Sequence, residues 1–158
     1  MIKPSFLYDR DTKILTATHD DGAAFDFFDV PPALYNEMIR APSQVDFFNK
    51  RVWNSFEYSN RHHTVGTLLS YISDNIVGFP DDEMLNINSR TYENDTPLHI
   101  ACIWGDLHAV ELLIEAGSQV DVKNDMGYTP LHFAETYGHR RCVHRLLAAG
   151  AKPIETLP

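Results

Sequence analysis

The sequence has few cysteines, no long apolar run and a shortage of basic residues, and each absence narrows its class. Only Cys102 and Cys142 occur among 158 residues, which excludes a disulfide scaffold. Apolar stretches fall short of the roughly 18–20 residues that a membrane span needs, so we expect no integral membrane protein. The 22 acidic residues outnumber 13 basic ones, for a formal net charge of −9. The length suits one domain or two small units and excludes a large multi-domain enzyme.

The composition and the first residues point to a folded cytoplasmic protein. Hydrophobic residues make up 44% and charged residues 22%, which is near the average for globular chains. Charges at Lys3, Asp9 and Arg10 leave no room for the apolar core of a signal peptide. Both cysteines lie in helix-like segments, where a thiol is most often a small buried hydrophobe. We therefore expect a reducing cytoplasm.

The clearest pattern is an internal repeat of 33 residues. Thr96-Pro-Leu-His99 recurs as Thr129-Pro-Leu-His132. A threonine hydroxyl can cap a helix, and proline suits the first helical position, so each copy predicts a helix start. One repeat then spans residues 87–119 and the next spans 120–152. The match continues at the pairs Gly105 and Gly138, Val110 and Val143, Leu113 and Leu146, and Gly117 and Gly150.

This period and the Thr-Pro-Leu-His-x-Ala pattern resemble ankyrin repeats, which are stacked helix pairs joined by projecting loops. The resemblance implies that His99 and His132 are structural and hydrogen-bond within the turn. About three units are usually needed to bury a solenoid core, so the helical segment 67–77 is expected to be a degenerate N-terminal cap. Arg140 and Arg141 belong to a basic last helix, which we interpret as a solvated cap in preference to an anion site.

The first third of the chain has a different pattern. Strands are predicted within 5–19 and 24–30, around turns at 9–13 and 20–22, followed by helices at 33–41 and 45–53. Its characteristic residues are Tyr8-Asp9, Gly22, Phe25, Val30-Pro31, Tyr35, Ala41-x-Ser43, Phe47-Phe48-Asn49 and Val52. This run resembles the KTSC domain, a small module similar to one at the C-terminus of some lysyl-tRNA synthetases. The resemblance implies a bacterial or phage setting and contact with nucleic acid.

Together these patterns predict an α+β chain, with a small N-terminal β-meander plus helices followed by an α-helical ankyrin repeat solenoid. Residues 1–63 are expected to form a KTSC-like β-β-β-α-α unit. Residues 64–86 should hold the degenerate capping helix and an acidic loop. Residues 87–158 should hold two ankyrin repeats with a C-terminal cap. The oligomeric state is left open by the sequence.

No motif for catalysis, a metal or a cofactor is visible. His62 and His63 are adjacent and His139 and His144 are five apart, so neither pair has the i, i+4 spacing of a zinc protease helix. Nucleophile elbows, phosphate loops and dinucleotide fingerprints do not occur. Ser43 is interpreted as a helix N-cap. We therefore expect neither an enzyme nor a metal or cofactor site.

A candidate binding surface follows from the ankyrin register, because the residues between the structural positions face the concave side. This set is rich in the aromatic side chains that are enriched at protein interfaces. The alternative is that the N-terminal unit covers these aromatics as an intramolecular core. The candidate residues are Tyr92, Glu93, Asp95, Ile103, Trp104, Asp125, Met126, Tyr128, Phe133 and Tyr137.

The charge beside this surface indicates the kind of partner. Residues 64–104 hold six acidic residues against Arg90 alone. An acidic surface with aromatic anchors suits a basic protein partner, although a merely solvated acidic loop explains the charge equally well. We expect a non-enzymatic protein-protein interaction module, such as an immunity or inhibitor protein that covers the active site of a basic toxin or nuclease.

The alternative partner is RNA, bound through the N-terminal unit. Residues 1–63 contain nine acidic residues against seven basic ones, so no basic field covers the unit. Phosphate neutralisation supplies most non-specific affinity for nucleic acid, and a locally concentrated patch would be needed. The candidate patch is Lys50, Arg51 and Arg61. We rank nucleic acid below a protein partner.

Overall fold

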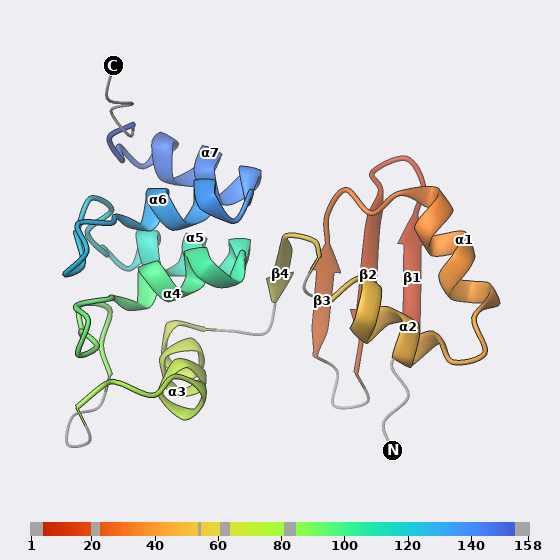
Figure 1. Ribbon diagram of the computed structural model, residues 1–158, viewed down its shortest axis with the longest axis horizontal. Coiled ribbons are helices and arrows are strands. Elements are labelled where there is room, and N and C mark those ends of the chain that lie inside the picture. The colour runs from red at the N-terminus through yellow and green to blue at the C-terminus, as the bar shows by residue number, and fades with distance from the viewer. Residues whose placement is uncertain (1–4, 20–22, 54, 61–63, 81–84, 154–158) are drawn as a thin grey trace. The chain divides into compact units, whose positions relative to one another are not determined.

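The computed structural model describes residues 5–19, 23–53, 55–60, 64–80 and 85–153. The chain divides into two compact units, residues 1–62 and 63–158 (Figure 1). The first unit contains an antiparallel sheet and the second contains the helical repeats. The α+β class predicted from the sequence is therefore confirmed.

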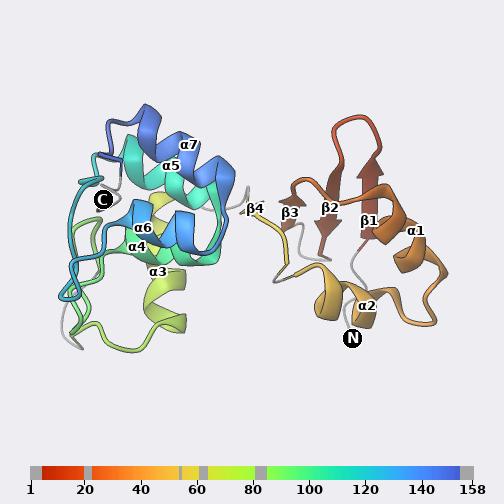
Figure 2. The ribbon, with the colours of Figure 1, turned by 45° about the horizontal axis from the view of Figure 1, so that its top comes forward.

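The first unit is a four-stranded antiparallel sheet with two helices on one face (Figure 2). Strand pairing places Leu15 between Tyr8 and Phe27, and all three side chains point to the face that packs on the helices. Phe48 meets Phe27 edge-on at a ring-centroid distance of 5.1 Å, which anchors the second helix on the sheet. The elements are β1 (Ser5–Asp9), β2 (Ile14–Thr18), β3 (Ala24–Phe27), α1 (Pro32–Arg40), α2 (Gln44–Arg51) and β4 (Tyr58–Asn60).

The fourth strand corrects the predicted β-β-β-α-α order. Tyr58–Asn60 is too short to show a period of two, so its sequence gave no strand signal. It is a strand because it pairs antiparallel with β3, with Tyr58 opposite Phe27. The predicted cap at Ser43 is confirmed, since its side chain accepts the backbone N–H of Asp46 at 3.2 Å. The predicted turn at 20–22 lies outside the described residues.

The second unit is a stack of helix pairs. Figures 1 and 2 show α4 beside α6 and α5 beside α7, with α3 at the first end of the stack. The predicted helical segment 67–77 is α3, and Thr64 caps it by accepting the backbone N–H of Thr67. The elements are α3 (Val65–Asn75), α4 (Pro97–Trp104), α5 (Leu107–Glu115), α6 (Pro130–Thr136) and α7 (Arg140–Ala148).

The repeated threonine and histidine cap the inner helices as the resemblance implied. Thr96 accepts the backbone N–H of His99 at 3.4 Å, and Nδ1 of His99 accepts the backbone N–H of Thr96 at 3.0 Å. Thr129 and His132 repeat both hydrogen bonds. The two histidines are therefore structural, because each closes a reciprocal capping box at a helix start.

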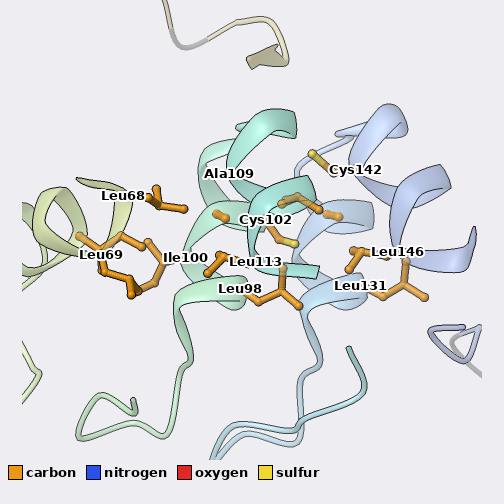
Figure 3. Close-up of a cluster of buried hydrophobic side chains, with 14 of the residues drawn as sticks. Leu68, Leu69, Leu98, Ile100, Cys102, Ala109, Leu113, Leu131, Cys142 and Leu146 are labelled. Carbon is orange, nitrogen blue, oxygen red and sulfur yellow. The ribbon is translucent and has the colours of Figure 1, made fainter. Parts of the chain in front are cut away.

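The core of the second unit runs along the whole stack (Figure 3). Leu98, Leu113, Leu131 and Leu146 have no solvent exposure, and α3 adds buried apolar side chains at the first end. Cys102 and Cys142 are buried thiols in this core, as predicted. Each repeat of the second unit therefore relies on its neighbouring repeat to cover its apolar face. Within the described residues, no helix combines the length and apolarity required to cross a membrane.

Candidate protein-binding groove

A groove of about 290 Å³ opens on the second unit where three segments meet. The segment after α3, the loop before α4 and α4 itself supply its walls. Five of the predicted site residues line it, so the structure brings half of the predicted set together. The lining residues are Ile76, Val77, Gly78, Thr91, Tyr92, Glu93, Asp95, Ile100, Ile103 and Trp104.

Backbone hydrogen bonds hold the loop that carries Tyr92. The backbone N–H of Tyr92 donates to the carbonyl of Gly78 at 2.8 Å, which ties this loop to the segment after α3. Thr91 accepts the backbone N–H of Asp95 through its hydroxyl at 3.0 Å. Tyr92 is 73% exposed, so a fixed backbone presents an aromatic residue to solvent.

Two of the predicted contacts also join the loops of the two repeats. The side-chain amide of Asn124 donates to the carboxylate of Asp95 at 3.0 Å. The side-chain amide of Asn94 donates to the carboxylate of Asp125. Sequence reasoning did not find this role of Asp95 and Asp125, because each partner lies about one repeat away in the chain.

One aromatic neighbour of the groove was missed by the sequence analysis. Tyr71 on α3 is 45% exposed and meets Trp104 edge-on at a ring-centroid distance of 5.7 Å. A signal existed, because Thr64 caps α3 as Thr96 caps α4. Aligning those two threonines places Tyr71 at the position of Ile103, on the surface of an inner helix.

The remaining predicted residues lie beside the groove and do not line it. Met126 and Tyr128 are exposed on the loop before α6. Phe133 is half-buried against His99, with ring centroids 5.8 Å apart. Tyr137 is exposed at the end of α6 and stacks on His139. The second repeat therefore extends the aromatic surface along the stack.

The groove is apolar with a negative edge. Glu93 and Asp95 are the two charged residues of its lining, and both are acidic. Asp95 shares its carboxylate with Asn124, whereas Glu93 is exposed. Burial lowers the pKa of His99, although the carbonyl of Tyr128 and the carboxylate of Asp95 raise it. The imidazole next to this edge is therefore neutral at pH 7 and adds no positive charge.

Two of the three nucleic-acid candidates lie at the end of α2. Lys50 and Arg51 are exposed in the last turn of α2. The guanidinium of Arg51 lies 3.9 Å from the carboxylate of Glu37 and 5.4 Å above the ring of Phe47. Arg61 lies outside the described residues. No group of three His, Cys, Asp or Glu side chains suited to a metal ion occurs in the described part of the chain.

These features define a repeat protein in which a loop and an inner helix line an exposed groove. The chain belongs to the ankyrin repeat family, because residues 58–156, more than half of its length, match the family described as ankyrin repeats (3 copies). This match includes α3 in the array. Residues 3–56 match the KTSC domain. Both resemblances stated from the sequence are confirmed.

One relative shares a short segment with this chain. A lysine–tRNA ligase from Nostoc punctiforme is 34% identical over 53 residues. The alignment covers 34% of this chain and 9% of the ligase, so the chain spans less than a tenth of that relative.

Proposed function

We propose that this protein is a non-enzymatic binding module whose groove binds a basic segment of a protein partner. Membership of the ankyrin repeat family supports protein-protein interaction as its role. The observation that carries the finer proposal is the groove lining, which combines apolar and aromatic walls with two carboxylates. A lysine or arginine side chain matches such a lining in both charge and shape.

The groove offers a basic side chain three kinds of contact. Its cationic head would lie beside Glu93, the more exposed of the two carboxylates. Its aliphatic stem would pack along Ile103 and Trp104, as the stems of long basic side chains do on apolar surfaces. A cation above the ring of Tyr92 or Trp104 gains about 0.5–2 kcal/mol from the cation–π interaction. An acidic side chain would be repelled by the two carboxylates and would lose all three contacts.

The proposal extends to an immunity or inhibitor protein that acts in a bacterial cytoplasm on a basic toxin or nuclease. The net charge of −9 supports this extension, because complementary charge speeds the encounter of two proteins. The exposed aromatics at Tyr92, Tyr128 and Tyr137 support it as well, since such side chains dominate the binding energy of interfaces.

The test is a pull-down from the lysate of the native host, with nuclease treatment. Glu93→Lys reverses the charge of the groove, and Glu111→Lys on α5 makes the same change away from the groove lining. Trp104→Ala with Tyr137→Ala removes two aromatic anchors. We expect a basic protein that survives nuclease, is retained by Glu111→Lys and is lost from the other two variants. A partner retained equally by all variants would remove the groove from the function.

A second candidate is RNA binding by the first unit, favoured by the similarity to a lysine–tRNA ligase. Lys50 and Arg51 would supply the phosphate contacts. This candidate predicts RNA affinity that falls steeply with salt and is lost in a Lys50→Glu, Arg51→Glu variant. RNA affinity that is independent of these two residues would remove them from this role.

A further inference from the structure

A second kind of pocket occurs twice in the second unit, at positions that are one repeat apart in the sequence. The internal pocket, of about 290 Å³, lies in the first repeat, and the end pocket, of about 410 Å³, lies in the last. Four lining positions of the internal pocket recur 33 residues later in the end pocket. The pairs are Asn88 and Asp121, Arg90 and Lys123, Thr96 and Thr129, and Gln119 and Lys152.

The two copies differ in what the capping histidine meets. In the first repeat, Nδ1 of His99 accepts the backbone N–H of Thr96, so the proton resides on Nε2. That Nε2–H donates to the carbonyl of Tyr128, which belongs to the next loop, at 3.1 Å. His132 has the same tautomer, because its Nδ1 accepts the backbone N–H of Thr129 at 3.2 Å. No carbonyl of the described residues accepts the Nε2–H of His132.

The charged groups of the pocket also differ between the copies, although the formal charge of the lining is +1 in both. Lys152 replaces Gln119, so the end pocket has two exposed ammonium groups, from Lys123 and Lys152. The carboxylate of Asp121 faces the same space, but one of its oxygens accepts the backbone N–H of Lys152 at 2.9 Å. Three side chains of the end pocket, those of His132, Lys123 and Lys152, are hydrogen-bond donors. They therefore favour a ligand that is rich in hydrogen-bond acceptors.

We propose that the end pocket binds an acidic loop of a protein partner. Such a loop would place a backbone carbonyl on Nε2–H of His132, as the loop of the second repeat does on His99. Its carboxylates would lie beside Lys123 and Lys152. This surface uses residues that the groove does not use, and it selects the opposite charge. The chain can therefore engage a second protein, or a second site on one protein, without competition at the groove.

The test is an amide NMR titration of the full-length chain with the capped peptide acetyl-Gly-Asp-Gly-Glu-Gly-amide. The matching lysine peptide and inorganic phosphate are titrated in parallel. We expect saturable shifts of the amides of Gly127, Thr129 and Lys152 with the acidic peptide. Shifts with the lysine peptide of the same size, or no saturable shift, would overturn the proposal. Phosphate that binds as tightly as the peptide would also overturn it, by assigning the pocket to a small anion.

A pair of charge-matched variants separates the pocket from the net charge of the chain. Lys123→Glu with Lys152→Glu changes the pocket, and Arg40→Glu with Arg140→Glu makes the same charge change at exposed sites elsewhere. The pocket variant should bind the acidic peptide at least tenfold more weakly, and the matched variant should stay within twofold of the native chain. Equal weakening in both variants would show that only net charge attracts the peptide.

Discussion

The imidazole ring of His139 lies so close to Gly105 that a Cβ on this glycine would stand 2.5 Å from Nδ1 of the ring. Nε2 of the same ring lies 3.2 Å from the carbonyl oxygen of Ile103, in hydrogen-bonding contact. Gly105 ends α4 in a left-handed conformation, with φ of 70°. The start of α7 is thereby locked onto the end of the preceding repeat.

Gly105→Ala should destabilise the second unit by about 2–5 kcal/mol. The left-handed backbone costs alanine about 1–2 kcal/mol, and overpacking against the ring adds about 1–3 kcal/mol. Urea unfolding measures the loss. Gly138→Ala is the matched control, because Gly138 has φ of 75° at the same repeat position but open space around its Cβ. Equal stability losses in the two variants would show that the ring of His139 moves aside with no further loss of stability.

Acid should weaken the second unit through His99. Burial lowers the pKa of this imidazole below its usual 6.5, against the opposing effects of the carbonyl of Tyr128 and the carboxylate of Asp95; Arg90 lowers it further. Below pH 6.5, His99 therefore binds a proton in the unfolded chain more readily than in the folded chain. Stability is full above pH 6.5 and falls as the pH drops toward the folded pKa, by about 1.4 kcal/mol per unit of depression.

Urea unfolding at pH 7.5, 6.5 and 5.5 measures this effect. His99→Gln should lower stability at every pH, because the capping box is lost, and should make the curve flatter between pH 6.5 and 5.5. A variant whose stability retains the full pH dependence of the native chain would assign the effect to another group.

The two acidic residues of the groove should separate into a scaffold role and a binding role. Asp95→Ala removes the acceptor of the Asn124 amide and should cost about 1.5 kcal/mol of stability. Glu93→Ala should leave the free energy of unfolding within about 0.5 kcal/mol of the native value, since the Glu93 side chain is exposed. The same change should weaken the binding of the protein partner. Thermal unfolding and a binding titration on both variants check this division. A stability loss from Glu93→Ala as large as that from Asp95→Ala would contradict it.

In the first unit, the hydroxyl of Tyr8 should stabilise the segment that enters α1. It donates to the carbonyl of Val30 at 2.7 Å, and its ring stacks on Tyr35. Tyr8→Phe keeps the ring stack and removes the hydrogen bond. The free energy of unfolding of the first unit should therefore fall by about 1 kcal/mol. Tyr35→Phe is the control, since it changes the other ring of the stack and leaves the hydroxyl of Tyr8 in place. No difference between the two variants would mean that water replaces the bond.

The sequence predicted the helices of the repeats because their signals are local. A capping threonine, a proline and a histidine stand within four residues at Thr96 and again at Thr129. The buried leucines then follow from helical periodicity. The starts of α4 and α6 could be predicted from these residues, whereas the direction in which their inner surfaces face followed from the resemblance to ankyrin repeats.

What the sequence did not predict depends on distant partners. β4 exists through its pairing with β3, more than thirty residues away in the chain. The bond from Asn124 to Asp95 likewise joins separate repeats. No local pattern marks such contacts. Five lining residues of the groove were therefore predicted from the sequence, whereas others, including Ile76 and Val77, were not.

The most direct test of the central claim is the dissociation constant of the captured protein partner for Glu93→Lys, compared with Glu111→Lys, at low and high salt. The account predicts that Glu93→Lys weakens binding at least tenfold, that Glu111→Lys stays close to the native value, and that salt narrows the difference between them. Equal dissociation constants for the two variants would contradict the assignment of the groove as the binding site.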